Sequence, residues 1–255
     1  MLLKSRLSVL WFGNRRFSMR RKSMIKNRII TYLLTLTLLA TVVVYSPPAY
    51  AATSSSSKVN SEAIIKSLRA NYDGSLASAI VGRAVWYMEY GYIKYGHSKY
   101  ATTGYCDCSQ FLSMVYKDFG YSVTSASRNY DKVGVPVKGV YVKNGKLVGA
   151  DKLKPGDIFT FQRTDHITHV AMYIGMFNGK PCFIGTTSGY PTAIGIVSGF
   201  NNWYGDQFHG VRRVLTDKAY LPGGKINDRG PVIPAVYRIK PTQSIVMPNK
   251  LPTGF

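Results

Sequence analysis

Residues 104–116 read Gly104-Tyr-Cys-Asp-Cys108-Ser-Gln-Phe-Leu-Ser-Met-Val-Tyr116, and this stretch decides the fold. Its first residues are typical of a loop. From Phe111 on, apolar residues recur every three or four positions, which predicts a helix with one buried face, and Gly120 is the kind of residue that follows a helix. Cys108 is therefore expected in the first turn of a buried helix, where the helix dipole and unpaired N–H groups favour a thiolate. The competing interpretation is a small core residue, since free cysteines are often buried.

A second stretch supplies a histidine. Residues 153–157 read Leu-Lys-Pro-Gly-Asp, which predicts a turn, and residues 169–175 read His-Val-Ala-Met-Tyr-Ile-Gly, which predicts a largely buried strand. An imidazole close to a thiol can take its proton and later return it to a leaving group. A cysteine at the start of a helix and His169 at the start of a strand together indicate a thiol hydrolase.

The N-terminal part of the chain has the pattern of a secretory signal peptide. Residues 1–51 hold nine Lys or Arg and no acidic residue, and an apolar run at residues 29–45 precedes Ala49-Tyr-Ala51. This order predicts export and cleavage after Ala51, with no stable membrane insertion afterwards. An uncleaved membrane anchor stays open as the alternative, because the apolar run is near the shortest length that spans a bilayer.

The charge of the exported part points to anionic partners. The whole chain has a net charge of +21, and removal of residues 1–51 leaves 24 basic and 12 acidic residues, a net charge of +12. For an exported protein the natural polyanions are wall polymers such as teichoic acids, and anionic lipid headgroups. Nucleic acid is not expected as a partner, because the sequence carries no nucleic-acid-binding motif and export separates the protein from it.

The cysteines allow two minor alternatives. An exported chain with three cysteines leaves one unpaired. If Cys108 is free, Cys106 and Cys182 are available for a disulfide, but three free thiols is the preferred interpretation. Cys106-x-Cys108 with His166-x-x-His169 also offers four metal-ligating side chains, yet the cysteine spacing is shorter than in zinc sites. No metal and no cofactor is therefore expected.

Composition divides the chain into four parts. These are a signal peptide at 1–51, a flexible Ser-rich linker at 52–60, a folded domain at 61–215 and a Pro-rich basic tail at 216–255. The tail holds six of the 12 prolines and shows little periodicity, so it is expected to be extended, with at most one short strand near residues 235–239.

The folded domain is expected to belong to the α+β class. Helical spacing predicts helices at 61–69 and 76–90 before the Cys108 helix. Asn144-Gly145 predicts a hairpin at 141–148, because Asn-Gly is the strongest short hairpin pattern, and Asn178-Gly179 predicts a second turn. Helices followed by antiparallel strands are typical of α+β domains. Beyond the hairpin, strands are predicted at 158–161, 169–174, 181–184, 195–198 and 209–215.

With Asp107-Cys108-Ser109, the Pro-Gly-Asp157 turn, His169-Val and a closing Gly210-Val-Arg-Arg-Val in this order, residues 76–215 resemble the NlpC/P60 family. The resemblance implies a papain-like fold with N-terminal helices packed on a central antiparallel sheet. It also implies a cysteine peptidase that hydrolyses γ-D-glutamyl-diamino acid bonds in peptidoglycan stem peptides. In this chain Cys108 would be the nucleophile and His169 the base. Asp107 and Ser109 would line the substrate pocket with a tyrosine, either Tyr92 or Tyr95.

One departure from the family pattern affects activity. The family's third residue, which orients the imidazole, aligns with Gly185, which has no side chain. Neighbouring Thr186, a backbone carbonyl or a water molecule would have to replace it. Gln110 also stands where the family commonly has glycine. The alternatives to a peptidase are therefore a degenerate domain that binds the cell wall without cleaving it, and a related thiol amidase or acyltransferase.

Overall fold

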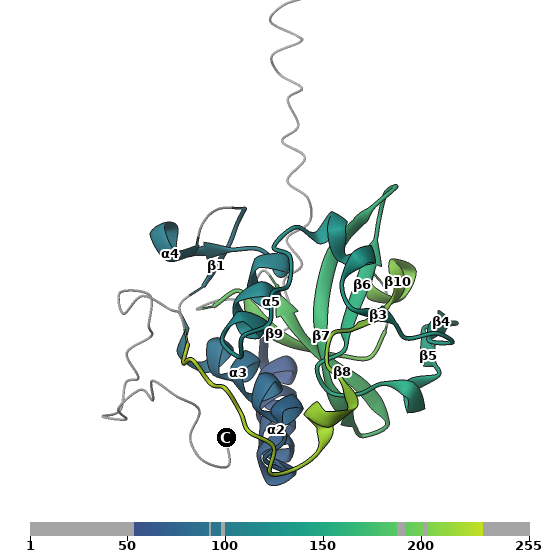
Figure 1. The fold of residues 1–255 in the computed structure, drawn as a ribbon. Helices are drawn as coiled ribbons and strands as arrows, with labels where there is room; N and C mark the ends of the chain where they lie inside the picture. The colour runs from purple at the N-terminus through teal and green to yellow at the C-terminus, as the bar shows by residue number, and fades with distance from the viewer. Residues whose placement is uncertain (1–53, 92, 98–99, 188–191, 201–202, 232–255) are drawn as a thin grey trace, which may run out of the picture. The chain divides into compact units, whose positions relative to one another are not determined.

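The computed structural model describes residues 54–231 apart from 92, 98–99, 188–191 and 201–202 (Figure 1). The chain divides into two compact units, residues 1–50 and 51–255, and the described residues all lie in the second. The predicted signal peptide and the predicted strand at 235–239 lie outside the described residues. Among those described, no helix has both the length and the apolar composition needed to cross a membrane.

The longer helices come first in the chain, as the sequence predicts. The predicted helix at 76–90 is confirmed, and it begins after Ser75, whose hydroxyl oxygen accepts a hydrogen bond from the Ser78 amide at 3.1 Å. The Cys108 helix is also confirmed, and Gly120 follows it with a φ of 86°. The helices of the described residues are α2 (Ser54–Ala70), α3 (Leu76–Tyr90), α4 (Tyr100–Thr103), α5 (Cys108–Lys117) and α6 (Trp203–Asp206), with 3-10 helices at Ser127–Lys132, Ala150–Lys152 and Asp217–Tyr220.

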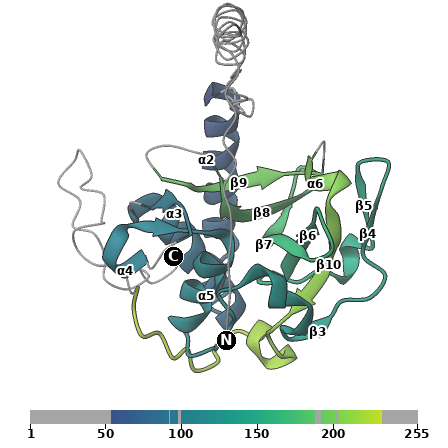
Figure 2. The ribbon, with the colours of Figure 1, turned by 90° about the horizontal axis from the view of Figure 1, so that it is seen from above.

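The described strands form one six-stranded sheet and two small pairs. In the order β3-β10-β6-β7-β8-β9, every neighbouring pair of the large sheet is antiparallel, so the predicted α+β class is confirmed (Figure 2). The large sheet contains β3 (Val135–Pro136), β6 (Ile158–Gln162), β7 (Ile167–Phe177), β8 (Lys180–Thr186), β9 (Ile194–Ser198) and β10 (Phe208–Arg213); the pairs are β1 (Lys94–Tyr95) with β2 (Tyr105–Cys106), and β4 (Tyr141–Lys143) with β5 (Lys146–Val148).

Both predicted Asn-Gly turns are present. Asn144 and Gly145 have φ values of 51° and 69°, and Asn178 and Gly179 have 49° and 71°. Two successive positive φ angles are what a two-residue turn needs to match the twist of its strands, and asparagine and glycine adopt them at the lowest cost. These turns join β4 to β5 and β7 to β8.

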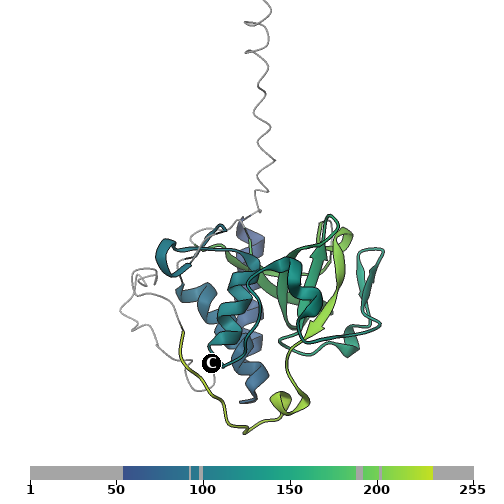
Figure 3. The ribbon, with the colours of Figure 1, turned by 45° about the horizontal axis from the view of Figure 1, so that its top comes forward.

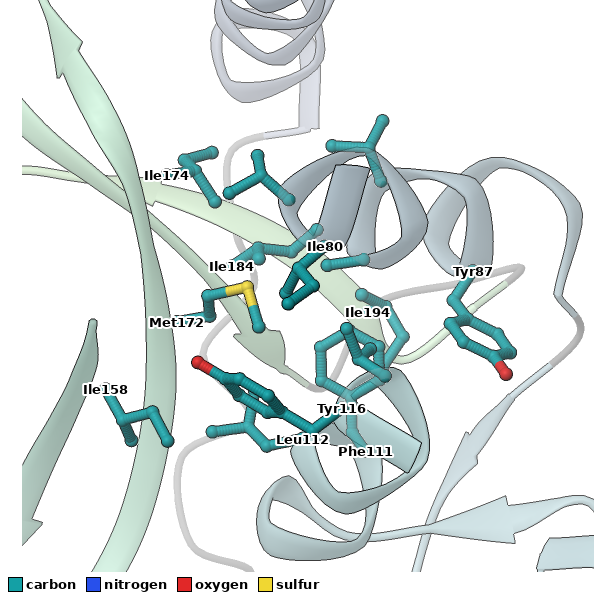
Figure 4. Close-up of a cluster of buried hydrophobic side chains, with 14 of the residues drawn as sticks. Ile80, Tyr87, Phe111, Leu112, Tyr116, Ile158, Met172, Ile174, Ile184 and Ile194 are labelled. Atoms are coloured by element: carbon teal, nitrogen blue, oxygen red, sulfur yellow. The ribbon is translucent and has the colours of Figure 1, made fainter. Parts of the chain in front are cut away.

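Alternating residues of the sheet build two separate apolar layers. Val170, Met172 and Ile174 of β7 belong to the cluster that packs against the helices, whereas Ala171 and Tyr173 belong to the cluster on the other face. Figure 4 shows the first cluster, in which side chains of the sheet meet those of α3 and α5. The labelled members are Ile80, Tyr87, Phe111, Leu112, Tyr116, Ile158, Met172, Ile174, Ile184 and Ile194.

The Pro-Gly-Asp157 turn is fixed to the end of the last strand. The fully buried carboxylate of Asp157 accepts two hydrogen bonds of 2.7 Å from the Arg213 guanidinium and one of 2.8 Å from the Lys154 amide. A two-point bond between guanidinium and carboxylate is strong and directional. It holds the start of β6 beside the end of β10. The Pro-Gly-Asp157 turn and the closing Gly210-Val-Arg-Arg-Val stretch therefore meet through this pair.

Two segments differ from the sequence prediction. Helix α2 begins at Ser54, inside the stretch predicted as a flexible linker, because extending an existing helix needs no new nucleus. The first part of the predicted tail is packed on the helices: the Arg229 amide donates to the Asp118 carbonyl at 2.8 Å, and Asp228 pairs with Arg83 (Figure 3). The buried Arg83 of α3 therefore binds the segment around Asp228 through an ion pair, although this segment has no apolar pattern of its own.

Candidate active site

Asp107 caps the helix that carries Cys108. Its backbone is extended, with φ −95° and ψ 178°, and its Oδ1 accepts 2.8 Å hydrogen bonds from the Gln110 amide and the Ser109 hydroxyl. This is the usual geometry of an aspartate before a helix, where it satisfies an otherwise unpaired N–H group. The Ser109 hydroxyl also lies 2.8 Å from the Ser125 carbonyl. Asp107 and Ser109 thus fix the loop and helix around the thiol.

Cys108 is buried and holds its proton. Burial is the main effect that raises the pKa of its thiol to about 11, and the Asp107 charge acts in the same direction. Backbone N–H groups of Val170, Ser109 and Cys108 itself oppose this, but they do not outweigh burial. The expectation that the helix start biases Cys108 toward thiolate is therefore wrong for the free protein, because sequence shows the dipole but not the loss of water.

The Val170 amide brings β7 to the thiol. Its N–H group is directed at Cys108, and Val170 is the residue that follows His169. Strand β7 packs against α5, so the backbone beside His169 adjoins the first turn of the cysteine helix. The contact between the two predicted elements therefore runs through the Val170 backbone, next to His169 in the chain.

His169 is surrounded by aromatic rings and is neutral near pH 7. The rings of Phe161 and Trp203 lie 5.6 and 5.7 Å from the imidazole, measured between centroids. Burial lowers the pKa of His169 to about 4, and the negative charge of Asp107 opposes this shift. Among the residues that the structure describes, none forms a hydrogen bond with the imidazole. A neutral imidazole is the form that can accept the thiol proton.

A cleft of about 250 Å³ opens over the thiol. His97 stands in its wall with Nδ1 3.1 Å from Oδ2 of Asp107, although its side chain is 76% exposed. One wall carries the cysteine loop, and the other carries the segment before and within the Ser127–Lys132 turn. The lining residues are His97, Asp107, Cys108, Ser109, Ser125, Ala126, Ser127, Arg128 and Thr168.

Comparison with known proteins identifies the family of this part of the chain. Residues 92–213 match the model of the NlpC/P60 family. This part of the chain is an NlpC/P60 domain. The family comprises cell-wall peptidoglycan hydrolases that are generally cysteine peptidases. No curated protein matches the chain.

Solved structures similar to the chain are NlpC/P60 proteins as well. A family member from Bacillus cereus is 23% identical, with a TM-score of 0.39 over 55% of this chain and 40% of its own. An NLP/P60 protein from Staphylococcus aureus is 22% identical, with a TM-score of 0.38 over 56% of this chain and 42% of its own. The NlpC/p60 domain of the peptidoglycan hydrolase SagA is 19% identical, with a TM-score of 0.32 over 48% of this chain and 88% of its own. The chain thus covers less than half the length of the first two.

Of the two tyrosines predicted to line the substrate pocket, the structure describes only Tyr95. Tyr92 lies outside the described residues. Tyr95 is 49% exposed, and its ring meets that of His97 edge to face at a centroid distance of 5.6 Å. Tyr95 therefore reaches the cleft through His97, at its rim. The sequence does not indicate His97 as a site residue, because a single histidine in a Tyr-rich loop has no characteristic spacing from other site residues.

The third position of the NlpC/P60 domain carries no orienting side chain. Gly185 lies beside Ala171: a Cβ added to it would stand 3.1 Å from the Ala171 Cβ. Thr186, the suggested replacement, points to the opposite face, because neighbouring strand residues alternate and Ile184 belongs to the helix-side cluster. Its hydroxyl is buried and has no hydrogen-bond partner among the described residues. The structure does not bring Thr186 to the imidazole, so that suggestion is wrong.

The metal interpretation has no support within the described residues, which contain no group of three or more His, Cys, Asp or Glu able to hold an ion. His166 is exposed and lies 2.7 Å from its neighbour Asp165. All three cysteines are free and buried, as the preferred interpretation predicts, so the Cys106–Cys182 disulfide is absent.

We expect Gly185→His to destabilise the domain rather than restore a third residue. The new Cβ alone would stand 3.1 Å from the Ala171 Cβ and 3.5 Å from the Val170 carbonyl oxygen, so β7 would have to shift. Overpacking of this kind costs about 1–3 kcal/mol, measured as the free energy of unfolding in urea. Gly210→Ala is the matched control, since its new Cβ would meet only the Thr160 hydroxyl at 3.9 Å. Equal stability of Gly185→His and wild type would show that the sheet has room there.

We expect His169 to make the fold sensitive to acid. Its pKa falls from 6.5 in the unfolded chain to about 4 in the folded one. The unfolded chain therefore binds this proton first, and stability that is complete above pH 6.5 declines as the pH falls toward 4. The loss is at most about 1.4 kcal/mol per pH unit. Urea unfolding of wild type and His169→Phe between pH 8 and 4 should give curves that separate only below pH 6.5; parallel curves would contradict the burial of this imidazole.

Proposed function

We propose that this protein is an exported cysteine peptidase that hydrolyses γ-D-glutamyl-diamino acid bonds in peptidoglycan stem peptides. The observation that carries the proposal is the position of Cys108 at the first turn of α5, with the Val170 amide directed at its sulfur. His169 is the residue before Val170 in β7. The NlpC/P60 domain that contains this arrangement supports the substrate class.

The reaction begins from a neutral pair. With a thiol pKa of about 11 and an imidazole pKa of about 4, the proton rests on sulfur in the free protein. As Cys108 attacks the amide carbonyl, its proton passes to His169 and a sulfur–carbon bond forms. We assign the stabilisation of the negative charge on the carbonyl oxygen to backbone N–H groups at the start of α5.

The second half of the reaction releases both products. His169 gives its proton to the leaving amine of the diamino acid as the carbon–nitrogen bond breaks, which leaves a thioester on Cys108. Water then attacks the thioester, gives its proton to His169, and releases the γ-D-glutamyl carboxylate with the free thiol. The polar cleft, lined by Asp107, His97 and Arg128, offers both signs of charge to a stem peptide that carries amines and carboxylates.

The test is cleavage of defined stem peptides, followed by mass spectrometry. The expected products are a fragment that ends in γ-D-glutamate and a fragment that begins with the diamino acid. A product cut at the sugar–peptide bond would instead indicate the amidase, and a product joined to an added amine would indicate the acyltransferase. Absence of every product, at enzyme concentrations equal to that of the peptide, would contradict the hydrolase.

A second candidate function is binding without cleavage. It is favoured by Gly185, because no described side chain forms a hydrogen bond with His169. The basic exported chain would then act by retention on peptidoglycan and its anionic polymers. Co-sedimentation with purified walls, with and without their anionic polymers, tests this alternative. The alternative requires wall binding by wild type together with no cleavage; export itself is tested by N-terminal sequencing of the secreted form, where a start at Ala52 is expected.

A further inference from the structure

The imidazole of His169 lies within an aromatic enclosure on the sheet face opposite the helices. Trp203 meets it nearly edge to face, with a centroid distance of 5.7 Å and an interplanar angle of 76°. Phe161 lies at 5.6 Å and 39°, and Tyr204 at 6.2 Å and 52°. These rings come from β6 and α6, so two elements outside β7 contact the imidazole.

The rings of the enclosure also fix one another. Trp203 and Tyr204 meet at 5.1 Å and 88°, and Tyr204 meets Phe161 at 5.3 Å and 68°. Behind them, Phe183 of β8 lies 5.0 Å from Tyr204. Edge-to-face contacts depend on orientation, because the positive edge of one ring faces the negative face of the next. A set of such contacts restricts the rotation of each member.

The enclosure occupies the face on which the missing third residue would act. Gly185 follows Phe183 by two residues on β8, so both point to this face. The added Cβ at Gly185 would already be within 3.1 Å of Ala171. A side chain at position 185 would therefore have to displace Ala171, while packed rings fill the region beside the imidazole.

We propose that Trp203 and Tyr204 are positioning residues that hold the His169 imidazole in its working orientation in place of a side chain at position 185. The proposal rests on the proposed function, in which His169 moves the thiol proton. The two residues act through the contacts of their rings with His169.

The enclosure favours the neutral state of the base. The charged group that acts on His169 is Asp107 of the helix start. Tyr204 of α6 lies against the imidazole, and β6 presents Phe161, which does not titrate. Apolar rings favour the neutral imidazole before the reaction.

The test compares Trp203→Ala with Trp203→Phe. Trp203 is 36% exposed, so its replacement leaves the core intact, and Trp203→Leu keeps apolar volume without a ring if alanine unfolds the domain. Tyr141→Ala, which removes a 51% exposed ring of the β4–β5 hairpin, is the matched control. Two quantities are measured: the pKa of His169 by NMR titration, with its signal assigned through His169→Gln, and kcat and KM for the stem peptide.

The expected result is a split between the variants. Trp203→Ala raises the pKa of His169 toward its ordinary value and lowers kcat by about 100-fold with little change in KM, since the base is misplaced and substrate binding is not. Trp203→Phe retains most of both properties, and Tyr141→Ala matches wild type. A folded Trp203→Ala or Trp203→Leu protein with wild-type pKa and kcat overturns the proposal. If wild type cleaves no peptide while the pKa of His169 still responds to Trp203, the proposed function fails and the contact with Trp203 stands.

Discussion

Replacement of Cys108 by alanine is expected to lower kcat for stem-peptide cleavage by at least about 10⁴-fold, because loss of a catalytic nucleophile removes the covalent pathway altogether. Binding of the peptide should change little. The backbone N–H groups at the helix start and the Asp107 carboxylate do not depend on the sulfur. Single-turnover cleavage, and peptide affinity by calorimetry, measure the two effects separately.

Cys106→Ala is the matched control for this experiment. Cys106 is also a buried free thiol and lies only two residues away, and burial is the main effect that raises its pKa well above the ordinary value. It is therefore no better as a nucleophile, and its removal should leave kcat within about threefold of wild type, as expected for a residue outside the reacting atoms. Cleavage that persists in Cys108→Ala and disappears in Cys106→Ala would show that Cys106 is the nucleophile and contradict the assignment of Cys108.

Replacement of Arg83 by methionine is expected to lower the free energy of unfolding by about 3–5 kcal/mol, the usual cost of leaving a buried charge without its partner. Arg83 is fully buried on α3 and donates to Asp118 at 2.7 Å and to both oxygens of Asp228 at 2.7 and 2.8 Å. Asp118 also accepts a 2.7 Å hydrogen bond from Tyr87. Loss of the guanidinium leaves the buried Asp118 carboxylate without its charged partner and removes the ion pair that holds Asp228.

The effect of Arg83→Met should depend on pH. Burial raises the pKa of Asp118 to about 6, although the hydrogen bonds from Tyr87 and Arg83 lower it. A raised pKa means that stability is present at low pH and is lost as the pH rises through the folded value, and removal of Arg83 raises that value further. The loss in urea unfolding should therefore be larger at pH 8 than at pH 5.

Arg69→Met is the control for Arg83→Met. Arg69 pairs with Glu89 at the same 2.7 Å, but its side chain is 42% exposed. Exposed pairs contribute about 0–1 kcal/mol, so this variant should be close to wild type at both pH values. Equal losses in Arg69→Met and Arg83→Met would show that burial does not determine the strength of the Arg83 pair.

Local sequence patterns predict most of the longer helices and strands and their order. The helix at 76–90, the two Asn-Gly turns and the strand that carries His169 all depend on residues close in the chain: apolar spacing, caps and residues that accept positive φ. Helix α5 starts at Cys108 because Asp107 caps it: the Asp107 side chain accepts a hydrogen bond from the Gln110 amide, three residues later. The motifs that indicate an NlpC/P60 domain are likewise contiguous stretches, and the family match confirms the resemblance that they carry.

The protonation and packing of the site depend on tertiary contacts. The thiol of Cys108 is protonated because the sheet and the surrounding loops remove its water, which no local pattern reveals. The imidazole lies against Trp203 and Tyr204 because α6 packs beside β6 and β7, although many residues separate them in sequence. The same is true of Arg83, which holds Asp228 across 145 residues. Burial, ring packing and ion pairs depend on which distant residues meet, and that is fixed only when the two faces of the sheet are covered.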